Sequence, residues 1–330
     1  MLNAVQKAAY ELIQADARFL YTLTVIQRNA KNISSNYIMM CQPYIGLFTD
    51  GAEQWCKKLG LGAPKFTDTE KKYYAVLRQS HKLYEMSYSD YLSALMMKFK
   101  TSDDYFYKIR SCYEKLFGYY NVGTDLCNKH FCGNTILCAL YMPVDILKDR
   151  EIGPWIRDIS VVAGKLTGFL GCQKFPPYNY NDNILVKHED YHFFENCPLK
   201  VKTELGFLLF SILCSINYAI KFIDQYFVEE IPQKFKFAYL QYYYLCDFIK
   251  ELNVANGTTF YINDSMKDRS LRNCLAHYGL GQYLSENELI DDDVLKGLTN
   301  KAFSMAYFDA KDKLYFYLTE LTNQIEEKIF

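Results

Sequence analysis

The chain has 330 residues, of which half are hydrophobic and 23% are charged, so it can bury a large core and is too apolar for a disordered protein. Sixteen glycines and eight prolines are few for this length, which disfavours a many-stranded sandwich or barrel. The formal net charge of −1 excludes a global attraction to nucleic acid or to an anionic membrane. We therefore expect an all-α protein, more than about 55% helix and less than about 8% strand, against averages near 33% and 22%.

The cysteines and the apolar segments bear on the cellular compartment. Eleven cysteines, an odd number, are scattered from Cys41 to Cys274, and the first residues carry no apolar secretory segment. This pattern predicts a reducing, cytoplasmic location. Residues 205–220 are the most apolar stretch, but they include Asn217 and two serines and are shorter than the ~18–20 residues of a membrane span. We interpret them as a buried core helix and expect no membrane contact.

The first 170 residues show helical spacing and predict an N-terminal helical region over 1–170. Apolar residues recur every three or four positions over 3–30, and a shorter pattern over 35–60 is broken by Pro43 and Gly51. These two patterns predict one long helix followed by shorter pieces.

Further along, Thr67 and Glu70 have the spacing of a capping box. They open a helical pattern that extends toward residue 100. The sequence then predicts a helix over 102–121 and another over 124–141.

Residues 171–198 differ in composition and predict an irregular seam. They hold Pro176, Pro177 and Pro198 together with several asparagines and aspartates. Beyond the seam, residues 199–330 predict a second helical bundle, and the N-terminal helices either pack on it as one unit or form a separate domain. Helical patterns cover 199–230, 233–254, 265–279 and 300–328, and the run 258–262 predicts one isolated strand.

The segment from Ser270 to Gly279 carries the most chemical information. Asp264 and Ser265, with Asp268 three residues after the serine, have the pattern of a helix start, and Gly279 and Gly281 have that of a helix stop. The segment is therefore expected to form a short helix.

This short helix brings together three side chains suited to phosphate chemistry. Asn273 and His277 are four residues apart and share a helix face, and Arg272 lies beside it. A guanidinium binds two phosphate oxygens with a planar fork, and a histidine near neutral pKa can take or give a proton. The asparagine can orient the histidine or hold a phosphate oxygen, so the arrangement requires no metal.

The same residues resemble the motif of the HEPN superfamily (higher eukaryotes and prokaryotes nucleotide-binding). That motif is an arginine followed four to six residues later by a histidine, commonly with an asparagine directly after the arginine. Here it is Arg272-Asn273-x-x-x-His277, with Leu271 before the arginine and Ala276 before the histidine. The resemblance extends over the helical residues 199–330, although only the ten-residue segment is specific.

The resemblance implies a HEPN-like helical bundle toward the C-terminus that commonly dimerises and so brings two motifs together. Many members are metal-independent endoribonucleases of toxin, antiphage or RNA-decay systems. By this resemblance His277 is the general acid and base, Arg272 stabilises the charge on the phosphorus, and Asn273 supports them. The 2′-hydroxyl of RNA attacks the adjacent phosphate and leaves a 2′,3′-cyclic phosphate and a 5′-hydroxyl.

The expected partners follow from the same resemblance: RNA, a second copy of the chain in a homodimer and, for a toxin, an antitoxin protein, with neither DNA nor a cofactor. Other members have lost activity. The alternative function is therefore a catalytically silent module that binds RNA, a nucleotide or a protein. A cleft in which Arg272 and His277 face solvent favours the nuclease, whereas burial of His277 against apolar helices favours the silent module.

Arg110 and Glu114 are candidates for a supporting polar pair beside the site. They are four residues apart within a helical pattern. The alternative, which we favour, is a solvated ion pair on one helix face.

Two further motifs suggest metal ligands. His188-Glu189-x-x-His192 has the spacing with which a helix binds zinc through two histidines and uses the glutamate as a general base. A zinc hydrolase is the third functional hypothesis, but the polar surroundings favour a polar loop or a short surface helix.

A second cluster comprises Cys127, His130, Cys132 and Cys138. It lacks the paired spacing of structural zinc sites, so we interpret its cysteines as buried thiols. The run Tyr242-Tyr243-Tyr244 could stack on bases, but packing in an aromatic core is the favoured interpretation.

Overall fold

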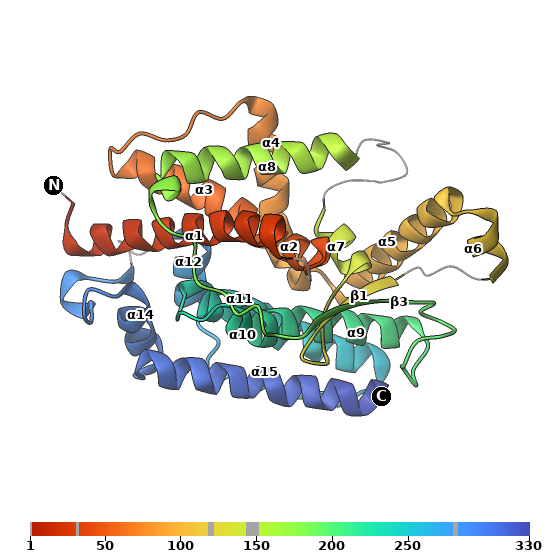
Figure 1. The fold of residues 1–330 in the computed structure, drawn as a ribbon. Coiled ribbons are helices and arrows are strands. Elements are labelled where there is room, and N and C mark those ends of the chain that lie inside the picture. The colour runs from red at the N-terminus through yellow and green to blue at the C-terminus, as the bar shows by residue number, and fades with distance from the viewer. Residues whose placement is uncertain (1, 31–32, 118–121, 143–151, 280–282) are drawn as a thin grey trace.

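The computed structural model describes residues 2–30, 33–117, 122–142, 152–279 and 283–330, and 69% of it is helical (Figure 1). The predicted predominance of helix is therefore confirmed. The described residues also contain a small antiparallel sheet of three strands, which the expectation of an all-α protein missed.

The N-terminal region begins with the long helix that the apolar spacing predicts. The capping box of Thr67 and Glu70 is also confirmed, since each side chain accepts a hydrogen bond from the other's backbone nitrogen. The helix predicted to start at 102 is wrong, because α5 begins after Ser87 and continues to Ile109; its expected end near 121 lies outside the described residues. The helical elements of this region are α1 (Ala4–Asn29), α2 (Ser35–Met39), α3 (Gln42–Lys58), α4 (Asp68–Gln79), the 3₁₀ segment η1 (Ser80–Glu85), α5 (Tyr88–Ile109), α6 (Cys112–Phe117), α7 (Thr135–Tyr141) and α8 (Ile152–Phe169).

The sheet occupies residues that the sequence assigned to a helix over 124–141. β1 (Val122–Cys127) pairs antiparallel with both β2 (His130–Asn134) and β3 (Val186–Tyr191), in the order β2-β1-β3. Between β1 and β2, the two turn residues Asn128 and Lys129 both have positive φ, of 48° and 71°, which matches the twist of a tight hairpin and cannot continue a helix. Only α7, which Asn134 caps, retains the predicted helical conformation.

The C-terminal region contains most of the predicted helices. The strand predicted over 258–262 is wrong, because the backbone there bonds to side chains: Phe260 N donates to Asn253 and Tyr261 N to Gln324. The predicted seam is irregular except for η2 (Cys172–Lys174) and β3. The remaining elements are α9 (Glu204–Asn217), the π-helical segment η3 (Tyr218–Ile223), α10 (Asp224–Tyr226), α11 (Pro232–Asn256), α12 (Arg269–His277), η4 (Glu286–Glu288), α14 (Val294–Phe303) and α15 (Tyr307–Ile329).

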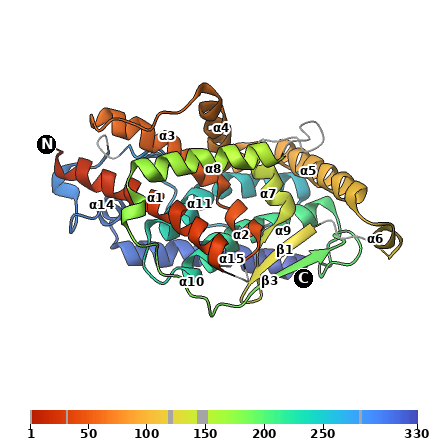
Figure 2. The same ribbon diagram turned by 45° about the horizontal axis from the view of Figure 1, so that its top comes forward.

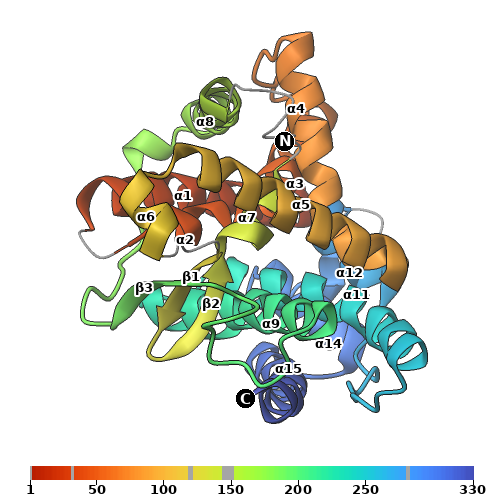
Figure 3. The ribbon, with the colours of Figure 1, turned by 90° about the vertical axis from the view of Figure 1, so that its right-hand side faces the viewer.

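The helices form stacked layers around one core. Figures 1 and 3 show α8 above α1, then α9 and α11, and α15 below them. Figure 2 shows the sheet at the end of the molecule that carries α5 and α6. One continuous cluster of buried apolar side chains extends from α1 to α15.

The segment Glu204–Tyr226 lies inside this core. By length and composition alone it could cross a membrane, but 94% of its most apolar window is buried among the other elements. The predicted burial of the apolar helix is therefore observed in the fold.

Candidate functional site

The helix α12 carries the Arg272–His277 motif and packs against α3 and α11. Its N-cap is Asp268, whose carboxylate accepts a hydrogen bond from Leu271 N at 2.6 Å. The helix start expected at Asp264 and Ser265 is wrong, because these residues form the preceding turn. The helix ends at Tyr278, one residue before the predicted glycine stop, in the left-handed conformation with φ 50°.

Tyr278 fixes the end of α12 to the core. Its hydroxyl donates to the carboxylate of Asp16, and Lys236 Nζ lies 2.6 Å from Asp16 Oδ2. All three side chains are buried, and burial lowers the pKa of Lys236 while Asp16 opposes that change. A Cβ at Gly51 would lie 2.5 Å from the Tyr278 ring, so α3 approaches this anchor as closely as a glycine allows. The C-terminal end of α12 is thus anchored to buried residues of α1, α3 and α11.

Arg272 is the least expected feature of the site, because its charge is buried with no counter-ion in the described part of the chain. The residue is 8% exposed, and its guanidinium lies over the rings of Tyr243 and Tyr244, 5.0 and 5.5 Å from their centroids. It makes no ion pair or hydrogen bond with any residue that the structure describes, and its Nε is buried without a partner. Because burying an unpaired charge is unfavourable, this guanidinium is a candidate binding group for an anion.

His277 is half-buried and hydrogen-bonded through Nδ1. That atom lies 2.7 Å from Nη2 of Arg78, and a guanidinium can only donate, so Nδ1 accepts and the proton of the neutral ring resides on Nε2. The pKa of His277 is lowered to about 4, chiefly by burial and then by the positive charges of Arg78, Arg272 and Lys82. The negative charge of Asp50 acts in the opposite direction. The imidazole is therefore neutral at physiological pH.

Asn273, the third residue of the motif, is half-buried next to Arg272. Its side chain makes no hydrogen bond within the described part of the chain. The helix thus brings Arg272 and His277 into one electrostatic environment, and Asn273 remains available at its edge.

The structure adds two residues that the sequence prediction missed, Arg78 and His81. Arg78 lies on the last turn of α4 and forms an ion pair through Nη1 with Asp50 of α3. His81 follows in η1, is 8% exposed, and shares a hydrogen bond between its Nδ1 and the carbonyl oxygen of Arg78. Burial lowers the pKa of His81 to about 3, so this ring is also neutral.

The two imidazoles have opposite tautomers. A carbonyl can only accept, so Nδ1 of His81 carries the proton and its Nε2 has a free lone pair, whereas His277 carries its proton on Nε2. A signal for the missed residues is present in the sequence, where Leu77-Arg78-Gln79 resembles Leu271-Arg272-Asn273 and each run precedes a histidine.

Three buried polar atoms near this cluster have no hydrogen-bond partner among the residues that the structure describes. They are His81 Nε2, the Tyr244 hydroxyl and Arg272 Nε. The ring of Tyr244 is close to both other groups: its centroid lies 5.9 Å from the His81 ring centroid and 5.5 Å from the Arg272 guanidinium carbon. Since buried polar groups are usually paired, the cluster has more hydrogen-bonding capacity than the described residues use.

Arg110 and Glu114 do not join this cluster. They form an i,i+4 ion pair at 4.0 Å where α5 meets α6, and Glu114 also accepts from the backbone of Ser111. Figures 1 and 3 show α6 and α12 well separated. The favoured i,i+4 ion pair is therefore present, although the Arg110 side chain is only 20% exposed and is less solvated than expected.

The zinc motif lies on a strand instead of the helix that its chemistry requires. His188 and Glu189 are neighbours in β3 and point to opposite faces, and His192 follows the strand. Hydrogen bonding to Asp125, at 2.9 Å, and to Asp190 raises the pKa of His188 to about 10. His192 lies near Glu195 instead, with 3.3 Å between Nδ1 and Oε2. The two histidines are therefore not on one helix face, and the premise of the zinc hydrolase is wrong.

Most side chains of the cysteine cluster and of the tyrosine run are buried in the core. Cys132 and Cys138 are buried thiols that donate to backbone carbonyls, and Cys127 is also buried. Among the described residues, no group of three or more histidine, cysteine, aspartate or glutamate side chains is arranged to hold a metal ion. Tyr242 and Tyr244 are buried, as the core interpretation predicts.

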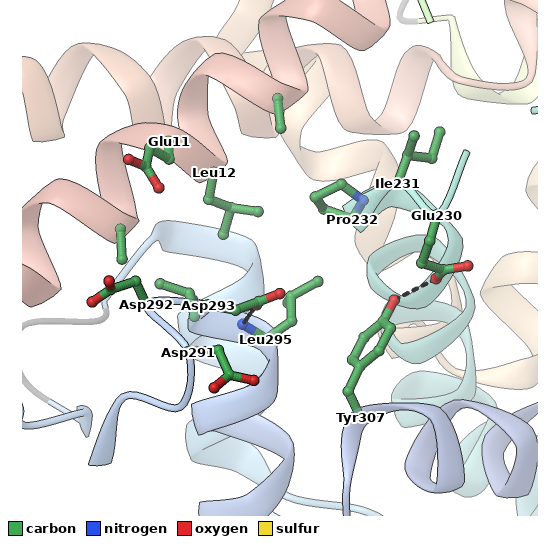
Figure 4. A pocket seen from close by; sticks show the side chains of 13 residues that line it. Glu11, Leu12, Glu230, Ile231, Pro232, Asp291, Asp292, Asp293, Leu295 and Tyr307 are labelled. Atoms are coloured by element: carbon green, nitrogen blue, oxygen red, sulfur yellow. Dashed lines mark hydrogen bonds between the residues drawn. The ribbon is translucent and has the colours of Figure 1, made fainter. Parts of the chain in front are cut away.

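A hollow of about 350 Å³ lies elsewhere, between α1, α11 and α14 (Figure 4). Most of its acidic groups are already engaged: Glu230 accepts from Tyr307 and Lys311, and Asp293 caps α14. The hollow contains no residue of α12. Its acidic lining residues are Glu11, Glu230, Asp291, Asp292 and Asp293.

No protein-family model, curated protein or solved structure matches the chain. The resemblance to the HEPN superfamily therefore rests on the residues of the Arg272–His277 segment.

Proposed function

We propose that the chain cleaves RNA without a metal ion, at a site that contains Arg272 and His277. The observation that carries this proposal is the charge of Arg272, which has no carboxylate partner among the described residues and shares α12 with the neutral imidazole of His277. A phosphodiester has one negative charge and oxygens that match the fork of an arginine. The resemblance of this segment to the HEPN motif supports RNA as the substrate.

The proposed reaction is an internal transesterification. The 2′-oxygen bonds to phosphorus, the bond between phosphorus and the 5′-oxygen breaks, the 2′-hydroxyl loses a proton and the 5′-oxygen receives one. His277 is assigned the proton transfer, and Arg272 stabilises the charge that develops on the phosphoryl oxygens. The products are a 2′,3′-cyclic phosphate and a 5′-hydroxyl, so atoms and protons balance without water or metal.

A second candidate is a silent module that binds the same phosphate without cleaving it. Two observations favour it. Arg272 is 8% exposed and packs over Tyr243 and Tyr244, so it lacks the solvent-facing position expected of the nuclease. The pKa of His277, about 4, makes the imidazole a weak base. Both candidates require an anion at Arg272. They differ in whether His277 exchanges a proton.

A cleavage assay on purified protein separates the two candidates. Wild-type protein should cleave single-stranded RNA in EDTA and leave 2′,3′-cyclic phosphate ends, and RNA with 2′-deoxy residues should resist. His277→Ala should reduce the rate by ~10²–10⁴-fold, the usual contribution of acid–base catalysis, and Arg272→Ala should be comparably damaging. Asn273→Ala should be milder. The matched control is Arg269→Ala, an exposed arginine on the same helix, which should retain activity.

Three results would contradict the nuclease proposal or its mechanism. Wild-type protein that binds RNA but does not cleave it supports the silent module. Cleavage that survives His277→Ala removes the catalytic assignment, and activity that EDTA abolishes and zinc restores removes the metal-independent mechanism.

A further inference from the structure

We propose that Arg78 is a second phosphate-binding arginine of this site, so that one chain supplies two guanidiniums and the histidine that Arg78 contacts. The phosphodiester as ligand is taken from the proposed function; the position of Arg78 is independent of it. Arg78 lies on α4 and contacts His277, which is 199 positions later in the sequence. The N-terminal helices therefore contribute directly to the motif on α12.

The guanidinium of Arg78 donates to two acceptors, a strong one and a weak one. Nη1 pairs with the carboxylate of Asp50, whereas Nη2 donates to the neutral imidazole of His277 at 2.7 Å. An anionic phosphate oxygen is a better acceptor than a neutral ring nitrogen, because charge-assisted hydrogen bonds are stronger. Nη2 is thus the donor of Arg78 that a phosphate would recruit.

The charges around the site leave room for one anion. Asp50 neutralises Arg78, and Glu85 lies 3.3 Å from Lys82, whereas Arg272 has no acidic partner among the described residues. One positive charge remains, and it would balance the single negative charge of one phosphodiester.

The unpartnered atoms of the cluster point to a ligand of the same kind. His81 Nε2 is an acceptor, Arg272 Nε is a donor, and the Tyr244 hydroxyl can be either. All three residues are more than nine-tenths buried. A phosphate next to a hydroxyl offers the complementary set of acceptors and one donor.

Recruitment of Arg78 by phosphate would change the state of His277. The charged or titratable groups that act on this imidazole are Arg78, Arg272, His81 and Lys82, with Asp50 the acidic one. A phosphate that takes Nη2 frees Nδ1 to accept a proton and adds a negative charge that favours the imidazolium. His277 would thus become a better proton carrier when the substrate is bound.

The first test reads the histidine directly and needs no RNA cleavage. In ¹⁵N-histidine-labelled wild-type protein, Nδ1 of His277 should have the shift of an unprotonated nitrogen, and inorganic phosphate should shift it toward the protonated form. In Arg78→Gln the tautomer preference should be lost, the pKa of His277 should rise from about 4 toward 6.5, and phosphate affinity should fall roughly 10–100-fold. Arg28→Ala, an exposed arginine on α1, is the control and should behave as wild type.

Unchanged ¹⁵N shifts and unchanged phosphate affinity in Arg78→Gln would overturn the proposal. If that variant does not fold, Arg78→Lys keeps the ion pair with Asp50 but not the fork, so the same loss of tautomer preference is expected. Because both measurements use phosphate alone, they hold even where the wild-type protein cleaves no RNA.

The second test asks whether one chain holds the whole site. Arg78→Gln and Arg272→Ala chains are each expected to be inactive, and mixing them should restore nothing. Recovery of cleavage in the mixture would show that the two arginines act from different chains, which contradicts a site within one chain. Where the wild type is inactive, phosphate binding by the mixture is the readout, with recovered high-affinity binding as the contrary result.

Discussion

Replacing Arg272 by methionine should stabilise the free protein, although the residue is buried. Two terms oppose each other in this substitution. The guanidinium contacts with Tyr243 and Tyr244 are lost, and cation–π contacts of this kind contribute ~0.5–2 kcal/mol. The substitution also removes the cost of burying a charge that has no counter-ion among the described residues, which is roughly 3–4 kcal/mol.

The second term is larger, so the free energy of unfolding of Arg272→Met should rise by about 2 kcal/mol. Methionine fills a similar volume with an unbranched side chain, so no large cavity forms. With an unfolding entropy of ~2.1 cal/mol/K per residue over this length, the melting temperature should rise by roughly 3 °C.

Differential scanning calorimetry and urea denaturation measure both changes. Phosphate at 100 times its dissociation constant should stabilise wild-type protein by about 2.7 kcal/mol and should not stabilise Arg272→Met. The control Arg269→Met changes an exposed arginine of the same helix and should stay within ±0.5 kcal/mol, the usual range for surface substitutions. If Arg272→Met destabilises the protein by more than ~1 kcal/mol, the guanidinium supports the fold and the anion site at Arg272 is refuted.

Two other predictions concern buried or coupled charges. Asp16→Ala leaves Lys236 buried without its partner and should reduce the free energy of unfolding by about 3–5 kcal/mol, measured by urea denaturation; a loss below 1 kcal/mol would show that the pair does not anchor α12. Asp125 and Asp190 raise the pKa of His188 from 6.5 to about 10, so the stabilisation by protonated His188 is full below about pH 6.5 and is lost as the pH rises toward 10. Wild-type protein should therefore lose its stability advantage over His188→Ala between pH 6 and pH 10 in thermal melts, and a constant difference would contradict the coupling.

The helices show which structural features can be predicted from local sequence. The apolar spacing over 3–30 and the capping box at Thr67 depend on residues within one or two turns, and both predictions are confirmed. The hairpin at 122–134 is different, because a short apolar run suits either a helix or a strand. The positive φ of Asn128 and Lys129 and the pairing of β1 with β3 decided that choice, and β3 lies far along the chain.

The candidate site likewise has features that local sequence predicts and features that it does not. That Arg272 and His277 share one short helix could be predicted from the sequence, because helical periodicity and the spacing of the motif are local, although the helix begins after Asp268 instead of at the expected Ser265. Two features of the site depend on tertiary packing: Arg272 is buried with no counter-ion among the described residues, and Arg78 donates to His277 across 199 positions of sequence. Burial and charge pairing depend on which distant helices pack together, and these two properties set the protonation state of the histidine.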